Sequence, residues 1–385
     1  MGNVQSEGVY ETMPVHNHGS IHYTRIGDEE SSRRSFQPFL STETRLTNKL
    51  LKTSLNGIWS IQHPNLRCPS PRIGHFSCVN PERTIAYIGY GSDHHNAYSD
   101  LWKLDMITLE WTEIRLCGNV LSPRSGCSAV YVDGVAYVFG GYHSPHFYGD
   151  MHSIDLKTGY VTLLETSGSP PDERSTPLIA HYNKKIFIWG GYNTTYPTEL
   201  SILNLSTMAW AHKSSGINGR TSVPYVTNGS SLYCYGGSKT ETLLVLDMES
   251  EVFTEYSTSG SPPPFDIAAA GMAYAEGYIF WFGGKSKSQF NLMFALELRS
   301  KWWFVFHVCP DGDTTTYADG QIDKLGLFLL PRIDSFGMQY CPKTRNLIGY
   351  LGNPLTNPPP FFVVSLTDAL PVLKLREDMI DLLRV

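Results

Sequence analysis

The sequence predicts an all-β fold, a six-bladed β-propeller in which each blade is a four-stranded sheet. Three markers that repeat in one phase predict it: an apolar run ending in glycine, a preceding turn that ends in arginine, and a following polar residue with a bulky apolar partner. The runs between the markers are short, rich in Val, Ile, Tyr, Phe and Trp, and bounded by Gly, Pro, Asn and Ser, which is typical of antiparallel strands.

The glycine marker sets the repeat length. Its six copies are "IAYIGYG" (85–91), "VAYVFGG" (135–141), "IFIWGG" (186–191), "LYCYGG" (232–237), "IFWFGG" (279–284) and "LIGYLG" (347–352). The last glycines are separated by 50, 50, 46, 47 and 68 residues, a period expected of stacked units such as propeller blades. Glycine is expected at these strand ends because neighbouring blades crowd the chain and the turn requires positive φ.

The other two markers keep the same phase. The turn-then-arginine lies about seventeen residues before the glycines, at Arg72, Arg124, Arg174, Arg220 and Arg332, and the fifth copy has Asp266 instead. After the glycines, an acidic or amide residue precedes a bulky apolar one by six positions: Asp105 and Trp111, Asp155 and Val161, Asn204 and Trp210, Asp247 and Phe253, Glu297 and Trp303. We expect the tryptophans to pack between blades rather than bind a ligand.

A glycine pair after an apolar strand, followed by a distant tryptophan, resembles the kelch repeat over about residues 56–370. The resemblance implies a propeller with its blades around a central channel. The second repeat, "SGCSAVYVDGVAYVFGGYHS", and the spacing of Leu375, Met379 and Leu383 further resemble kelch-domain substrate receptors of ubiquitin ligases. Two departures stand against the activity of a ubiquitin-ligase substrate receptor. Those receptors normally have cysteine where Met379 stands. Their substrate-binding arginines after the fourth glycine pair are replaced here by "GGSKTE", with only Lys239.

The spacing also predicts how the ring closes. Trp59 precedes Arg72 by the same 13 residues that separate Trp111 from Arg124, so "GIWSIQ" (57–62) is expected to supply the outer strand of the sixth blade. That blade's own strands are expected near 334–340, 346–350 and 361–366. A competing interpretation assigns the closing role to "VLKL" (372–375).

Three regions follow: a flexible N-terminal tail (1–54), the propeller (55–372), and a C-terminal tail or short helix (373–385). The start, "MGNVQS", matches the acceptor pattern for myristate on Gly2. A single myristoyl chain binds membranes only marginally, so any membrane association is expected to be reversible. With no secretory signal and no apolar run long enough to span a membrane, we expect a cytoplasmic or peripheral membrane protein.

Composition excludes several functions. The net charge of −6 argues against nucleic-acid binding. Seven cysteines without a CxxC pair indicate neither a disulfide framework nor a zinc knuckle. No cofactor or metal is expected, because two candidate sites fail: the histidines His94, His95, His143 and His146 lack an acidic partner in fixed register, and the aspartates Asp311, Asp313, Asp319 and Asp323 do not fit the EF-hand pattern.

The loops after the glycines and the arginine turns are expected to project from one face, where a rigid scaffold normally binds its ligand. The candidate binding residues are Arg72, Arg124, Arg174, Arg220, Arg332, Tyr142, His143, Tyr192, Lys239 and Lys285. Arginines beside tyrosines suit an acidic or C-terminal peptide. The alternative is that each arginine braces its own blade.

The sequence therefore predicts a monomeric, non-catalytic scaffold or adaptor that binds a protein or peptide through the loop face of the propeller. One alternative is the substrate-recognition subunit of a cullin-RING ubiquitin ligase. Another is a propeller enzyme with an unrecognised site, although the sequence contains no GxSxG, HExxH or P-loop motif.

Overall fold

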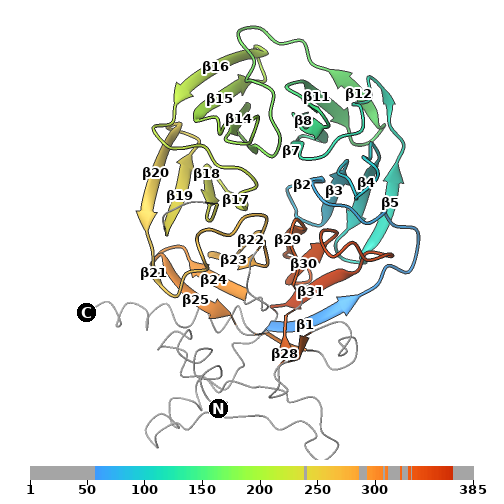
Figure 1. Cartoon of the computed structure of the whole chain (residues 1–385), viewed down its shortest axis with the longest axis vertical. Coiled ribbons are helices and arrows are strands. Elements are labelled where there is room, and N and C mark those ends of the chain that lie inside the picture. The colour runs from blue at the N-terminus through green and yellow to red at the C-terminus, as the bar shows by residue number, and fades with distance from the viewer. Residues whose placement is uncertain are drawn as a thin grey trace, which may run out of the picture.

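Six antiparallel sheets surround a central axis as the blades of a propeller (Figure 1). The computed structural model describes residues 57–237, 241–285, 293–306, 308–310, 321–322, 328–330 and 332–366. The predicted six-bladed fold is confirmed. Every regular element in these ranges is a strand, so they include no helix with the length and apolar character of a membrane span.

Each blade is numbered by its inner strand along the chain. Blade 1 contains β2 (Phe76–Val79), β3 (Ile85–Gly89), β4 (Leu101–Asp105) and β5 (Glu110–Ile114). Blade 2 contains β7 (Ser128–Val132), β8 (Val135–Phe139), β11 (Met151–Asp155) and β12 (Tyr160–Leu163). Blade 3 contains β13 (Leu178–Tyr182), β14 (Lys185–Trp189), β15 (Glu199–Asn204) and β16 (Ala209–Ser214).

The second half of the ring repeats this order. Blade 4 contains β17 (Tyr225–Asn228), β18 (Ser231–Cys234), β19 (Thr242–Asp247) and β20 (Val252–Ser257). Blade 5 contains β22 (Gly271–Ala275), β23 (Tyr278–Phe282), β24 (Met293–Glu297) and β25 (Trp302–Phe306). Blade 6 contains β29 (Gly337–Cys341), β30 (Asn346–Tyr350), β31 (Phe361–Ser365) and β1 (Gly57–Gln62).

Strand β1 closes the ring from the other end of the chain. It pairs antiparallel with β31, with Trp59 opposite Val364 and Ile61 opposite Phe362. This confirms the prediction that 57–62 supplies the outer strand of the sixth blade. The Trp59 side chain is 1% exposed and stacks on Phe362, with 5.8 Å between ring centroids. The closing strand is therefore anchored by main-chain bonds and by an apolar side chain.

The link between blades also protects sheet edges. Strands β6 (Cys117–Gly118), β21 (Ser259–Gly260) and β26 (Val308–Pro310) run parallel to the outer strands β12, β25 and β1. Each short strand belongs to the segment that enters the blade, so the outermost main-chain groups of that sheet gain a partner. Two further hairpins, β9 (Tyr142–His143) with β10 (His146–Phe147) and β27 (Gln321–Ile322) with β28 (Phe328–Leu329), lie outside the six sheets.

The polar marker of each repeat shapes the hairpin between the third and fourth strands. The Asp105 carboxylate accepts hydrogen bonds from the main-chain N–H groups of Ile107 and Thr108, at 2.8 and 3.1 Å. Asp155 and Asn204 accept the equivalent pairs of bonds in the next two blades. Short polar side chains favour turns through such bonds, which is why the marker recurs.

The bulky marker six residues later fills the space between blades. Trp111 stacks on Phe361 of blade 6, with 5.7 Å between centroids and an interplanar angle of 15°. The ring centroids of Trp303 and of Tyr235 in blade 4 are 5.0 Å apart. Trp210 is buried among residues of blades 2 and 3. The prediction that these tryptophans pack between blades is confirmed.

Several sequence predictions fall outside the described residues. They are the tail with Gly2, the competing strand 372–375, the C-terminal segment with Met379, Lys239, and the aspartates at 311, 313, 319 and 323.

Candidate partner-binding face

The turns before the inner strands and the loops after the glycines meet at one face of the ring. We name this the loop face; its described loops are 92–99, 142–149, 192–198 and 353–360, together with Lys285, Arg332 and the link residues 119–123 and 171–173. The opposite face carries the hairpins between the first and second and between the third and fourth strands of each blade.

A closed ring of six main-chain hydrogen bonds holds the loop face together. The last glycine of each blade donates to the carbonyl of the arginine position in the next blade. The donor and acceptor pairs are Gly91 to Arg124, Gly141 to Arg174, Gly191 to Arg220, Gly237 to Ile267, Gly284 to Ile333, and Gly352 to Arg72, at 2.8 to 3.1 Å. The bond from Gly352 joins the last blade to the first. The repeating glycines are therefore contacts between blades as well as turns.

This ring corrects the register of the last two arginine markers. The residues equivalent to Arg72 are Ile267 in blade 5 and Ile333 in blade 6, one position after the predicted Asp266 and Arg332. Both isoleucines are buried, at 7% and 0% exposure, whereas Arg332 is exposed. The pattern "LPR" resembled the marker by chance; in blade 6 the small residue Ser335, two positions after Ile333, indicates the true register.

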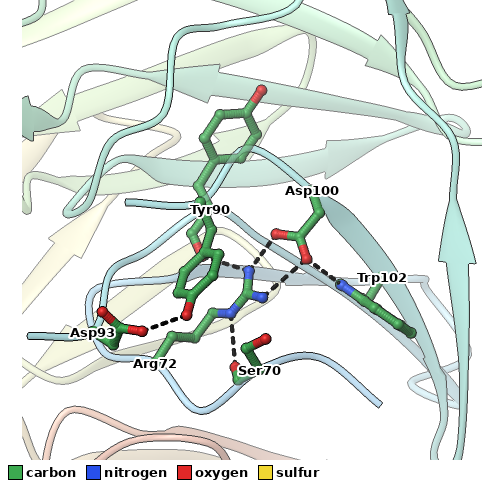
Figure 2. Close-up of polar contacts among 7 residues, drawn as sticks. Ser70, Arg72, Tyr90, Asp93, Asp100 and Trp102 are labelled. Atoms are coloured by element: carbon green, nitrogen blue, oxygen red, sulfur yellow. Dashed lines mark hydrogen bonds and ion pairs between the residues drawn. The ribbon is translucent and has the colours of Figure 1, made fainter. Parts of the chain in front are cut away.

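Arg72 shows what the arginine position does (Figure 2). Its side chain is 1% exposed and forms a bidentate ion pair with Asp100, in which Nη2 lies 2.9 Å from Oδ2. Nη1 also donates to the Tyr90 carbonyl at 3.1 Å, and Nε donates to the Ser70 carbonyl at 3.0 Å. Burial alone would raise the pKa of Asp100, but the hydrogen bonds and charge of Arg72 outweigh it and the pKa is lowered.

Arg124 repeats this arrangement in blade 2. Its Nη1 lies 2.5 Å from Oδ1 of Asp150 and donates to the Gly140 carbonyl at 3.3 Å. Each guanidinium also lies over a tyrosine ring, Arg72 over Tyr98 at 4.0 Å and Arg124 over Tyr148 at 3.6 Å. Sequence reasoning missed these partners, although the shared Tyr-x-Asp at 98–100 and 148–150 was a usable signal.

The next two blades keep the main-chain bond but change the charge partner. Arg174 donates to the Gly190 carbonyl at 3.2 Å, and no ion pair joins it to a carboxylate among the described residues. Desolvation lowers its pKa, with Asp172 and Glu199 acting in the opposite sense. Arg220 donates to the Gly236 carbonyl at 3.4 Å and lies 3.3 Å from Glu255, which is 43% exposed.

The burial of these arginines limits what they can contact. Arg72, Arg124, Arg174 and Arg220 are 1%, 2%, 3% and 6% exposed, and their donors point at carbonyls and carboxylates of their own blades. The geometry supports the bracing alternative that the sequence left open for these four. Arg332 is the predicted arginine that is exposed on this face.

Sequence reasoning also missed a second ring of residues, two positions after the arginine position, which we name the left-handed ring. All six residues there have left-handed backbone conformations, with φ between 48° and 68°: Gly74, Gly126, Thr176, Ser222, Ala269 and Ser335. Gly126 donates to the Gly74 carbonyl at 2.7 Å, and Ala269 and Ser335 make equivalent bonds to the preceding blade. Four of the six are not glycine, so composition alone could not reveal the conformation.

The inner strands enclose a cavity of about 290 Å³ along the axis. Its lining includes His75, whose pKa is lowered to about 3 by desolvation and by the nearby charge of Arg72. On the opposite face, Arg83 reaches across the axis and donates to the carbonyls of Tyr274 and Thr227 at 3.0 and 3.1 Å. This side chain connects blade 1 to blades 4 and 5.

The remaining candidate residues lie in the loops. Tyr192 is 37% exposed, Tyr142 is half-buried, and His143 and Lys285 are exposed. The His143 Nδ1–H donates to the Pro123 carbonyl at 2.7 Å, so this ring is held against the link that enters blade 2. Tyr142 and Tyr192 are brought together through Phe147, which contacts both rings.

The histidines of the loop face do not assemble a metal site. His94 and His95 are neighbours in one exposed turn, with 6.5 Å between ring centroids, while His146 pairs with His143 across the β9–β10 hairpin. Among the residues that the structure describes, no group of three or more His, Cys, Asp and Glu side chains is placed to hold a metal ion.

Comparison with known proteins yields a family model and several relatives. The KLHDC2/KLHL20/DRC7 kelch-repeats domain matches residues 40–237 and 183–318, which together cover most of the chain. Kelch domain-containing protein 2 of Bos taurus is 26% identical over 64% of this chain and 60% of its own length. Kelch domain-containing protein 3 of Rattus norvegicus is 28% identical over 44% of this chain and 48% of its own length.

A plant protein is also similar to part of this chain. Acyl-CoA-binding domain-containing protein 5 of Arabidopsis thaliana is 28% identical over 50% of this chain and 33% of its own length. The chain thus spans less than two thirds of each of these three relatives. The six-bladed ring, its glycine and arginine markers and the family model agree, and the chain belongs to the kelch-repeat family.

Proposed function

We propose that this protein is a non-catalytic interaction scaffold or adaptor that binds a protein partner through its loop face. The observation that carries the proposal is the aromatic surface over blades 2 and 3, which ends in the exposed Tyr192 and Tyr196 of blade 3. Tyr196 is 54% exposed and contacts Tyr192, with 5.4 Å between ring centroids. Exposed aromatic side chains gathered on a rigid scaffold are typical of binding sites.

The scaffold beneath these loops is rigid. Tyr142 and Tyr192 exchange main-chain hydrogen bonds with Ser125 and Ser175, at 2.7 to 3.0 Å. These serines directly follow the buried Arg124 and Arg174, so the loops are tied to the brace of their own blade. A surface held in this way loses little conformational entropy when a partner binds.

The alternatives have less support. The ubiquitin-ligase interpretation depends in part on the C-terminal segment, which lies outside the described residues. Membership of the kelch family does not assign catalytic residues to this chain, so the enzyme interpretation has no positive observation behind it.

The test is affinity capture from cell extract with the full chain and a Tyr192→Ala/Tyr196→Ala variant. The matched control is Tyr160→Ala, because Tyr160 is 53% exposed but lies at the start of β12, on the opposite face. We expect the double variant to lose partners that the control retains, with equal melting temperatures. If the double variant is folded and retains the same partners as the wild type, the loop-face proposal is wrong.

A further inference from the structure

Four aromatic rings form a continuous strip across the loop face of blades 2 and 3. We name Tyr142, Phe147, Tyr192 and Tyr196 the aromatic strip. The ring centroids are 4.7 Å apart between the first two residues, 6.0 Å between Phe147 and Tyr192, and 5.4 Å between the last two. The strip joins two blades and ends in the two exposed tyrosines.

Carboxylates border this strip. Asp172 and Glu173 are exposed in the link between the two blades, and the main chain of Glu173 lies against Gly149, at the end of the loop that carries Tyr142. Two residues further along, Ser175 pairs with Tyr192. Glu199, whose side chain is 58% exposed, follows the loop that carries Tyr196. The acidic groups therefore lie between the two aromatic loops and beyond the second.

Basic side chains are scarce in the same region, and the arginine it contains is buried. In the described segments 142–150, 169–176 and 192–199, Arg174 is the one basic residue apart from histidine, and its side chain is 3% exposed. Two exposed basic residues of the loop face, Lys285 and Arg332, belong to blades 5 and 6. The face over blades 2 and 3 is thus acidic and aromatic, the reverse of an exposed arginine surface.

The interior of blades 1 and 2 shows which side chain pairs with both a tyrosine ring and a carboxylate. Arg124 lies 3.6 Å above the ring of Tyr148 and pairs with Asp150, and Arg72 has the same two kinds of partner. A guanidinium group is attracted to an aromatic face and to a carboxylate at once. An aromatic strip bordered by carboxylates provides both partners to a cation that arrives from outside.

We propose that the aromatic strip binds a basic, extended peptide segment of a protein partner, with its arginine or lysine side chains over Tyr192 and Tyr196 and paired with Asp172, Glu173 or Glu199. This inference rests on the proposed function and specifies the chemistry of the partner. It replaces the acidic or C-terminal peptide expected from sequence, because four of the arginines on which that expectation rested are buried.

Two labelled peptides of about twelve residues test the sign of the charge, one a Gly-Ser-Arg repeat and the other a Gly-Ser-Glu repeat. Binding to the full chain is followed by fluorescence polarisation. We expect the arginine peptide to bind and the glutamate peptide not to bind. Raising the salt from about 50 to about 300 mM should weaken the complex, since it screens exposed charges.

Variants then locate the site. Tyr192→Ala/Tyr196→Ala and Asp172→Lys/Glu173→Lys should each weaken binding of the arginine peptide about tenfold or more. Tyr160→Ala should leave it unchanged, and melting temperatures check that all variants fold. Equal or stronger binding of the glutamate peptide, or arginine-peptide binding that these variants do not weaken, would overturn the inference.

The outcome separates this inference from the proposed function. If the tyrosine variant loses captured partners while the wild type does not bind the arginine peptide, the loop face is a binding site and the basic partner is wrong. If the variant retains every partner and the arginine peptide does not bind, both proposals fail.

Discussion

The first two blades and the last two fill the arginine position with different side chains, charged in one pair of blades and apolar in the other. In blades 1 and 2 the arginine position holds Arg72 and Arg124, each buried and paired with an aspartate. In blades 5 and 6 the same position holds Ile267 and Ile333, also buried. In all four, the carbonyl of this residue accepts a hydrogen bond from the last glycine of the preceding blade.

The difference shows that the ring depends on the main-chain bond rather than on the arginine itself. A buried ion pair contributes little net stability over a well-packed apolar residue, because desolvation offsets the attraction of the charges. The aspartate is replaced as well: aligning β31 with β4 places Pro360 where blade 1 has Asp100. Blade 1 thus has both charges, and blade 6 has neither.

The largest expected effect comes from breaking one pair without its partner. Asp100→Ala leaves the Arg72 guanidinium buried and unpaired, and should lower the free energy of unfolding by about 3 kcal/mol. Arg72→Ile combined with Asp100→Ala imitates blade 6 and should recover most of that loss. Thermal unfolding of the single and double variants measures both, and additive losses would show that the two residues do not act as a pair.

The reverse exchange in blade 6 is the control. Ile333→Arg places a charge where no aspartate stands at the matching position and should destabilise the protein as severely as Asp100→Ala, while Ile333→Met should cost under about 1.5 kcal/mol. If both substitutions at Ile333 cost the same, charge is not what distinguishes the blades.

The next effect concerns the residue after the left-handed ring. Blade 1 has His75 there, whereas blades 2 and 6 have Cys127 and Phe336. The pKa of His75 is lowered to about 3, so between pH 6.5 and 3 the unfolded chain binds a proton that the folded protein does not. Stability should therefore fall as the pH drops below 6.5, by about 2 kcal/mol at pH 5.

Denaturant unfolding at pH 7 and pH 5 isolates this contribution when wild type is compared with His75→Gln, which should lose less stability on acidification. His146→Gln, in an exposed hairpin, serves as the matched control. The explanation is wrong if His75→Gln retains the full pH dependence.

The smallest effect tests the left-handed ring itself. Gly74→Ala adds a Cβ atom 3.1 Å from Ser125 at a φ of +62° and should cost about 1 to 2 kcal/mol. Ala269→Gly relieves the same conformation in blade 5 and should stabilise the protein by about 0.5 kcal/mol, since the greater freedom of unfolded glycine offsets part of the gain. Calorimetric melting temperatures should shift in opposite directions, and equal signs would contradict the shared conformation.

Much of the ring was predictable because its signals are local. Glycine at a crowded strand end, Asp105 or Asn204 in a turn, and Trp111 six residues later each act within a few residues of where they stand. Their common phase predicted six blades, and the spacing of Trp59 to Arg72 predicted the closing strand. The candidate site was harder to predict, because an arginine in the sequence looks the same whether its charge is buried or exposed.

The sequence by itself determined the fold class, the number of blades and the segment that closes the ring, since periodic spacing reports repeated local geometry. Only the tertiary structure decided which carboxylate pairs with Arg72, that Ile333 rather than Arg332 occupies the arginine position, and that Phe147 joins Tyr142 to Tyr192. These contacts join residues from different strands or blades, and their distance and burial depend on how the blades pack. The same packing that buries the arginines leaves the loop face of blades 2 and 3 acidic and aromatic.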